Sequence, residues 1–127
     1  VKAAEAGRAM RMPERLQQIA RRLLAEAVAR PASVRMLFQR QDVQYLDEPS
    51  RGAARDFREG LQRIVAGGKS DGLVRAGPAE LWAAVWLEIV GLAVGRVASG
   101  EWGAEHPQAA LTIEAARDAI AAQPVRT

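Results

Sequence analysis

The stretch LWAAVWLEIVGLAVG, from Leu81 to Gly95, decides the fold because it is the most apolar part of the 127-residue chain. A helix that spans a membrane needs roughly 20 consecutive apolar residues. Glu88 interrupts this run and Arg96 follows it, so both uncharged pieces are too short to cross a bilayer. The sequence therefore predicts a helix that packs against protein and has no membrane partner.

This helix has two different sides when its residues are placed at 100° intervals. Bulky residues such as Trp82, Trp86 and Ile89 share one side. Small residues and one acid share the other side, namely Ala84, Glu88, Gly91, Gly95 and Ala98. A glycine inside a helix costs about 1 kcal/mol relative to alanine, and the close approach of another helix is the gain that would offset this cost. We predict that the small side meets a second copy of the chain and that the bulky side faces the core or a pocket; the alternative is a central helix of a monomeric bundle, buried all round.

Apolar residues recur at three- and four-residue spacing along the rest of the chain, and prolines and glycines separate the segments. This pattern predicts five helices, over residues 13–30, 31–41, 50–67, 78–100 and 107–123. No segment has the pattern of a β-strand. The fold class that we predict is therefore all-α, a helical bundle of about five helices joined by short links.

The length of the chain fits a single domain over residues 1–127. We expect residues 1–12 to be a link or the end of an earlier helix, and residues 13–123 to form the core. The N-terminal stretch lacks the apolar core of a signal peptide, and the chain contains no cysteine. Both features fit a cytoplasmic protein.

The residue types present argue against catalysis and metal binding. Because the chain has no cysteine and a single histidine, His106, disulfides, thiolate metal sites and multi-histidine metal clusters are excluded. No serine lies in the G-x-S-x-G motif of a nucleophile elbow. We therefore expect no enzyme activity, no catalytic or metal-binding residue and no cofactor; an acid–base enzyme that uses Glu88 is the least favoured class. Since His106 precedes Pro107 in a predicted loop, we expect it to be solvated.

Glu88 and Arg96 are the charged residues of the apolar helix, and they lie two turns apart with Leu92 between them. They can form a buried charge pair, take part in an interface, or anchor a ligand. A partly exposed ion pair at a helix contact is the simplest interpretation. Tyr45, in a predicted turn, is a further polar group that could anchor a ligand.

The order of these segments is similar to that of a known family. The segment DGLVRAGPAELWAA, residues 71–84, is a glycine-leucine-x-arginine turn followed by an apolar helix, and QAALTIEAARDAIAAQ closes the chain. Together they resemble the C-terminal regulatory domain of TetR-family transcriptional repressors. The N-terminal helix-turn-helix that marks the family is absent from this chain. The resemblance implies that the last two long helices form a four-helix bundle with their copies in a second subunit, and that the earlier helices enclose a ligand pocket.

Mapped by position, the resemblance places candidate site residues in two groups. The pocket would lie among residues 13–30, 31–41, 50–67 and the inner side of 78–100, and its composition predicts a small apolar or aromatic effector. The candidate ligand-binding residues are Leu23, Met36, Phe38, Phe57, Leu61, Trp82, Trp86 and Ile89, with Trp86 the strongest single candidate. The candidate dimer-interface residues are Ala84, Glu88, Gly91, Gly95, Ala98, Ile113, Ala116 and Ile120.

The function that we expect from the resemblance is effector binding and homodimerisation in a TetR-like repressor, with ligand binding shifting the dimer away from the DNA-binding state. The alternative is a helical dimerisation or scaffold module without a ligand. The net charge of +3 and the sequence pI of about 10.2 are only weak indications of nucleic-acid binding. DNA contact is expected only through the N-terminal domain that this chain lacks, because no segment reads as a recognition helix. The arginines at positions 8, 11, 15, 21 and 22 are expected to be solvated surface.

Overall fold

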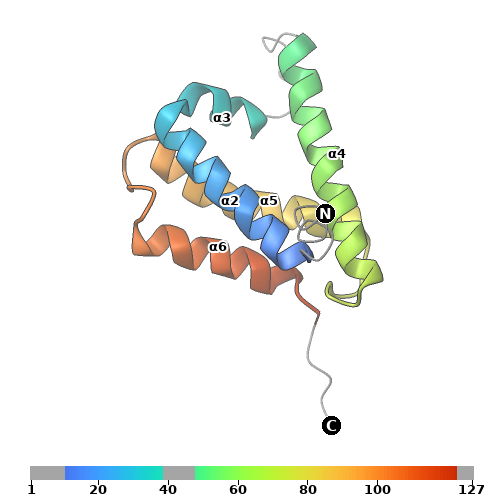
Figure 1. Cartoon of the computed structure of the whole chain (residues 1–127). Helices are drawn as coiled ribbons and strands as arrows, with labels where there is room; N and C mark the ends of the chain where they lie inside the picture. Colours follow the sequence, from blue (N-terminus) through green and yellow to red (C-terminus); the bar gives the residue numbers. More distant parts are fainter. Residues whose placement is uncertain (1–10, 39–47, 123–127) are drawn as a thin grey trace, which may run out of the picture.

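The computed structural model describes residues 11–38 and 48–122. These residues form the helices α2 (Met12–Ala29), α3 (Pro31–Leu37), α4 (Glu48–Ser70), α5 (Ala79–Ala98) and α6 (Pro107–Ile120) (Figure 1). No strand is present in these residues, and Val74 and Ala121 form one isolated antiparallel bridge. The predicted all-α fold with five helices is confirmed.

The break between α2 and α3 follows from the proline at position 31. A residue that precedes a proline is pushed out of the helical region, and Arg30 has φ −141° and ψ 68°. The guanidinium of Arg30 lies 2.5 Å from the carboxylate of Glu26, which raises the pKa of Arg30 through a hydrogen bond and charge attraction. The chain therefore turns sharply here and starts a second short helix.

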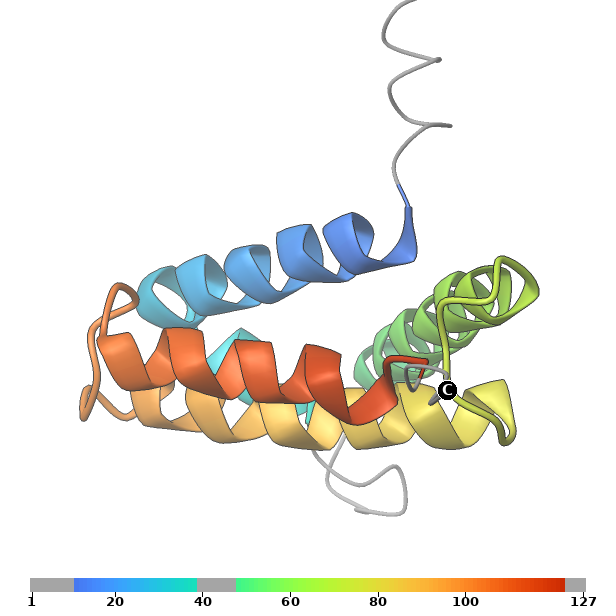
Figure 2. The ribbon, with the colours of Figure 1, turned by 90° about the horizontal axis from the view of Figure 1, so that it is seen from below.

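α5 is the central helix of the bundle, because it contacts each of α2, α3, α4 and α6. α6 runs antiparallel beside it, and α2 lies against the pair on one side (Figures 1 and 2). Trp86, Val90 and Ala93 are at most 1% exposed. By length and composition alone, α5 is also long and apolar enough to cross a membrane. In this fold the buried residues of α5 form the middle of the core, as helices that are apolar over most of their surface do in a packed bundle.

α4 continues two residues beyond the glycine pair, Gly67 and Gly68, that was expected to end it, and it stops at Ser70. The reason lies at Gly68, where the side chain of Met12 occupies the space that a Cβ atom would need. Gly68 is therefore a point of close approach between the start of α2 and the end of α4, rather than a helix terminator.

The loop between α4 and α5 is tied to both of its neighbours. Lys69 Nζ donates to the carbonyl of Gly77 at 2.5 Å, and Trp82 Nε1 donates to the carbonyl of Ala76 at 3.1 Å. The guanidinium of Arg75 lies 4.9 Å from the ring centre of Trp82, and the backbone nitrogen of Arg75 donates to the carbonyl of Ile120. The loop thus joins the beginning of α5 to the end of α6.

His106 lies in the loop before α6, as expected, but it is half-buried and has a structural role there. His106 is the N-cap of α6, where its Nδ1 accepts a hydrogen bond from the backbone nitrogen of Gln108 at 3.1 Å. Its ring stacks on Trp102 with the ring centres 5.3 Å apart, and it is half-buried. Cap and stacking together fix the turn between α5 and α6.

Candidate ligand pocket and dimer face

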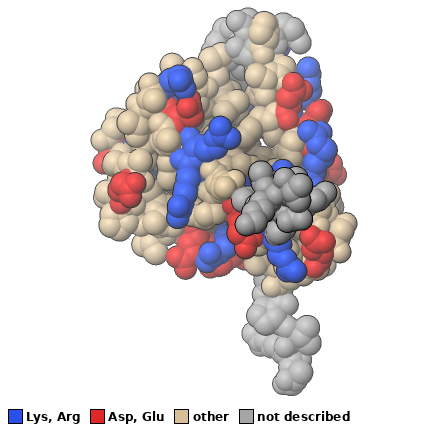
Figure 3. All heavy atoms as spheres, viewed as in Figure 1, with Lys and Arg blue, Asp and Glu red and all other residues tan. Residues whose placement is uncertain are grey.

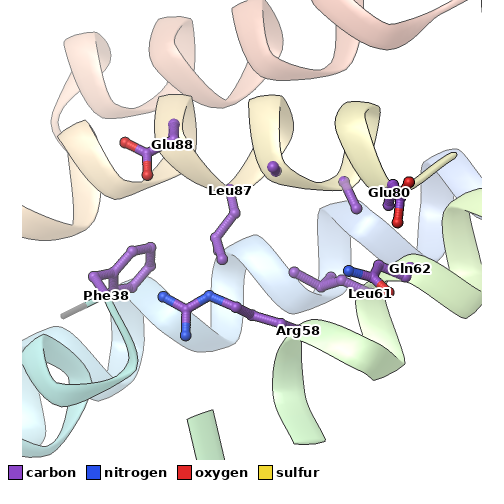
Figure 4. Close-up of a pocket in the computed structure, with 9 residues that line it drawn as sticks. Phe38, Arg58, Leu61, Gln62, Glu80, Leu87 and Glu88 are labelled. Atoms are coloured by element: carbon purple, nitrogen blue, oxygen red, sulfur yellow. The ribbon is translucent and has the colours of Figure 1, made fainter. Parts of the chain in front are cut away.

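A hollow of about 80 Å³ lies between α3, α4 and α5 (Figure 4). It forms because α3 and α4 meet the same side of α5 and leave a gap where the α5 side chains are short. α5 contributes two alanines there, Ala83 and Ala84. The lining residues are Phe38, Arg58, Leu61, Gln62, Glu80, Ala83, Ala84, Leu87 and Glu88.

Part of the wall of the hollow is apolar. Leu61 of α4 and Leu87 of α5 are 2% and 6% exposed. Leu87 points from α5 into the space between Phe38 and Arg58 (Figure 4). An apolar surface of this kind favours the aliphatic or aromatic part of a ligand, because it gains by excluding water.

Polar groups are also present in the hollow. Arg58 of α4 lines one side with its guanidinium, whose Nη1 is buried. Glu80 and Glu88 of α5 are exposed and lie at the rim, and Gln62 is half-buried. A guanidinium binds a carboxylate with two parallel hydrogen bonds. The arrangement therefore suits an amphipathic molecule with an apolar body and one polar or anionic group.

The structure brings only two of the predicted ligand-binding residues into this hollow, Phe38 and Leu61. Leu23 is buried in the core, and Phe57 and Met36 are half-buried without lining the hollow. Tyr45 lies outside the residues that the structure describes.

The tryptophan side of α5 was predicted to face the core or a pocket, and the structure places Trp86 in the core. Trp86 is 1% exposed and belongs to the core, Trp82 holds the loop before α5, and Ile89 is half-buried. None of these three side chains lines the hollow. The opposite side of the helix does so, with Ala84 and Glu88, which were predicted to contact a second copy.

The predictions for the dimer interface on α6 also need correction. Ile113, Ala116 and Ile120 are at most 5% exposed, because they pack in the chain's own core. A side chain that is buried within one chain is not available to a second copy. Leu111 and Ala115, on another line of α6, are exposed.

The two glycines of α5 have different surroundings. A Cβ atom on Gly91 would lie 3.1 Å from Phe38, so the close neighbour of this glycine belongs to the same chain. A Cβ atom on Gly95 would have no atom within 4 Å, and Gly95 is exposed. Ala98 is half-buried. Of the predicted interface on α5, Ala84, Glu88 and Gly95 remain exposed.

Pocket residues that sequence reasoning missed include Arg58 and Gln62 on α4 and Glu80 and Leu87 on α5. A usable signal was present, since these pairs are four and seven residues apart and each pair therefore shares one side of its helix. Periodicity does not say which side of α4 meets which side of α5.

Large apolar side chains remain exposed on the helix pair α5 and α6. Leu81 and Leu92 of α5 are 47% and 51% exposed, and Leu111 of α6 is 62% exposed. Leu81, Glu88, Leu92 and Arg96 lie on one stripe of α5, which we call the α5 stripe. Among the described helices, none covers the side of α5 that is turned away from α2 (Figure 2). The exposed leucines, on a side that no described helix covers, make α5 a candidate contact surface.

Neither the charges on the face shown in Figure 3 nor the metal-binding groups of the described residues give a competing site. Lysine and arginine side chains are interspersed with aspartate and glutamate on the face shown in Figure 3, without a large area of one sign. Residues 11–38 and 48–122 contain no group of three or more side chains placed to hold a metal ion. This face therefore lacks the single-sign field that nucleic-acid surfaces have.

Comparisons with known proteins do not add to this description. No protein-family model, curated protein or solved structure matches the chain.

Proposed function

We propose that this chain is the effector-binding and dimerisation domain of a TetR-like transcriptional repressor, acting as a cytoplasmic homodimer. The observation that carries the proposal is the hollow with a partly apolar wall and a guanidinium between α3, α4 and α5. The antiparallel pair α5 and α6, with exposed leucines at positions 81, 92 and 111, supports the dimerisation half of the proposal. The proposed role involves no catalysis and no cofactor.

The ligand that fits this site is small and amphipathic. Leu61, Leu87 and Phe38 offer an apolar surface, and Arg58 places a guanidinium, a group that binds carboxylates, in the lining. This proposal differs from the small apolar or aromatic effector that was expected from the sequence, because the lining of the hollow includes a guanidinium and no tryptophan.

The proposed mechanism is a population shift. Ligand pockets usually have volumes of about 300–1,000 Å³, whereas this hollow has about 80 Å³. A ligand larger than a few atoms therefore binds best to an arrangement in which α3 and α4 lie farther from α5. Because Ala84 and Glu88 line the hollow and are also exposed on α5, such a movement alters the surface that a second copy would meet. DNA heads attached outside this chain would then change their spacing, and half-sites on DNA require a fixed spacing.

Thermal and urea denaturation in the presence of small aromatic and aliphatic carboxylates tests the ligand half. A ligand that binds only the folded chain stabilises it by about 2.7 kcal/mol at 100 times its Kd. The matched control is Ala84→Phe, which fills the hollow from an exposed position on α5. We expect a carboxylate to stabilise the natural chain and to have little effect on Ala84→Phe. Equal stabilisation of both proteins would remove the hollow as the binding site.

The second candidate function is a helical dimerisation module without a ligand. The small volume of the hollow favours it, because well-packed cores also contain small voids. If no carboxylate, amine or neutral apolar compound stabilises the natural chain while the chain still forms a dimer, this second function replaces the first.

A further inference from the structure

Three exposed residues at the centre of the α5 stripe are evenly spaced. Glu88, Leu92 and Arg96 follow one another at intervals of four residues, so they lie almost in line along the helix. Leu92 is 51% exposed, the side chain of Arg96 is 46% exposed, and Glu88 is also exposed. An apolar residue is thus flanked by one negative and one positive residue at equal distances.

Glu88 and Arg96 cannot pair within one chain. Eight residues of α-helix span about 12 Å, which exceeds the distance over which an ion pair forms. Arg96 instead pairs with Glu101 and lies 5.7 Å from the ring centre of Trp102. Glu88 forms no ion pair with any residue in the described ranges 11–38 and 48–122.

This spacing suits a contact between two copies of α5 that are related by a two-fold axis. When two copies of one helix cross antiparallel, the residue at the crossing point meets its own copy, and residues at equal distances on either side meet each other. With Leu92 at the crossing point, Glu88 of one copy lies beside Arg96 of the other, and the same contact occurs twice. Each charged residue is then one turn, about 6 Å, from the crossing point.

The surroundings of Leu92 suit such a crossing. Gly95 lies one turn away on a neighbouring line of α5, and a Cβ atom there would have no neighbour within 4 Å. This open position leaves room for the leucine of a second copy. The α5 stripe is complementary in charge to its own copy, because charges of opposite sign lie at equal distances from Leu92. An unrelated protein or a lipid surface requires no such spacing, so the spacing favours a second copy as the partner.

We infer that the α5 stripe is a two-fold interface between two copies of this chain, in which α5 crosses its copy at Leu92 and Glu88 of each copy pairs with Arg96 of the other. The inference rests on the homodimer of the proposed function and adds the crossing point and the charge pairing.

Disulfide trapping tests the crossing point directly, because the chain has no cysteine of its own. Cβ atoms must come within about 3.5–4.5 Å for a disulfide to form. A Leu92→Cys variant is expected to form a covalent dimer under mild oxidation at micromolar concentration. Leu81→Cys is the matched control, since Leu81 is nearly as exposed at 47% but lies 11 residues from the crossing point. We expect it to cross-link at least tenfold more slowly.

Charge reversal tests the pairing. Glu88→Arg and Arg96→Glu each place like charges opposite each other twice in the homodimer, so we expect each variant to raise the dimer Kd about tenfold. A mixture of the two variants places opposite charges at both contacts. We therefore expect the mixed dimer to form in preference to either homodimer, as measured by ultracentrifugation and native mass spectrometry.

The control for charge reversal is the exposed pair on α2, Glu26→Arg and Arg30→Glu, which changes charge away from the α5 stripe. It should leave the dimer Kd unchanged and show no partner preference. Circular dichroism checks that each variant keeps its helix content. If Arg96→Glu is poorly folded, the cysteine variants still test the crossing point at Leu92.

The outcomes separate the two proposals. If the natural chain dimerises but Leu92→Cys and Leu81→Cys cross-link equally and the charge variants show no partner preference, the crossing at Leu92 is wrong while the homodimer stands. If the natural chain stays monomeric at high micromolar concentration, both the dimer and its crossing point are wrong. A heterologous partner or vesicle that binds the stripe while the chain stays monomeric also overturns the inference.

Discussion

Phe38 closes the space beside Gly91: a Cβ atom on this glycine would lie 3.1 Å from Cδ1 and 3.2 Å from Cε1 of the phenylalanine ring. The contact joins the end of α3 to the middle of α5, next to the hollow that Phe38 also lines. Gly91 therefore serves the fold of the single chain, and the cost of a glycine in a helix is offset there by a contact within the chain.

Alanine substitutions at the two glycines of α5 should have different effects. Gly95→Ala should raise the free energy of unfolding by about 1 kcal/mol, because alanine favours the helix and meets no neighbour. Gly91→Ala should gain less or lose stability, because the ring of Phe38 must move by a few tenths of an ångström. Urea denaturation at low protein concentration measures both. Equal gains in the free energy of unfolding for the two variants would mean that the ring of Phe38 moves aside without a free-energy cost.

A second pair of glycines tests the loop before α5. Gly77 has φ +128°, and a Cβ atom there would lie 2.7 Å from Nε1 of Trp82, which donates to Ala76. Gly72 has φ +76° and open space around its Cα. Gly77→Ala should therefore lower the free energy of unfolding by about 2–3 kcal/mol, and Gly72→Ala by only about 1 kcal/mol. Equal losses in the free energy of unfolding would show that the Trp82 side chain moves away from a Cβ atom at position 77 without a free-energy cost.

The helices could be predicted from the sequence because their signals are local. Pro31 breaks the chain after α2 through its effect on Arg30, and apolar spacing identifies α5 and α6. The end of α4 could not be predicted in this way. Gly68 reads as a terminator, but its role depends on Met12, which is distant in the sequence.

The candidate site was only partly predictable, because periodicity groups residues by side and does not say what covers each side. Phe38 and Leu61 were assigned to the pocket, and both line the hollow. Trp86 was assigned there by its position and its side of the helix, yet it is 1% exposed and belongs to the core. Ala84 and Glu88 line the hollow because α4 packs against their side of α5, and this packing has no local signal in the sequence.

The cap of α6 provides a further prediction. His106→Ala removes the acceptor for Gln108 and the ring that stacks on Trp102, so it should lower the free energy of unfolding by about 1.5–2 kcal/mol. His106→Asn keeps a side-chain acceptor at the cap and should recover about 1 kcal/mol of this loss. Urea denaturation followed by circular dichroism measures both variants. If Asn were no better than Ala, stacking alone would account for the role of His106.

Enlarging the hollow from inside provides the last prediction. Leu87→Ala removes a 6% exposed side chain that points between Phe38 and Arg58, so it should lower the free energy of unfolding by about 2–4 kcal/mol. It also makes room for a ligand without moving α3 or α4. Benzoate, which has an apolar ring and a carboxylate for Arg58, should therefore stabilise Leu87→Ala more than it stabilises the natural chain.

The control for this cavity is Val94→Ala, because Val94 is 2% exposed in the core and does not line the hollow. Val94→Ala should lose stability through the same kind of cavity but gain nothing from benzoate beyond the effect on the natural chain. Thermal denaturation at several benzoate concentrations measures the difference through the shift in Tm. A gain for Leu87→Ala alone would connect the volume of the hollow to ligand affinity, as expected if the natural chain must separate its helices before it binds. Equal gains for both variants would instead indicate a general effect of benzoate on destabilised proteins and would count against the hollow as an effector site.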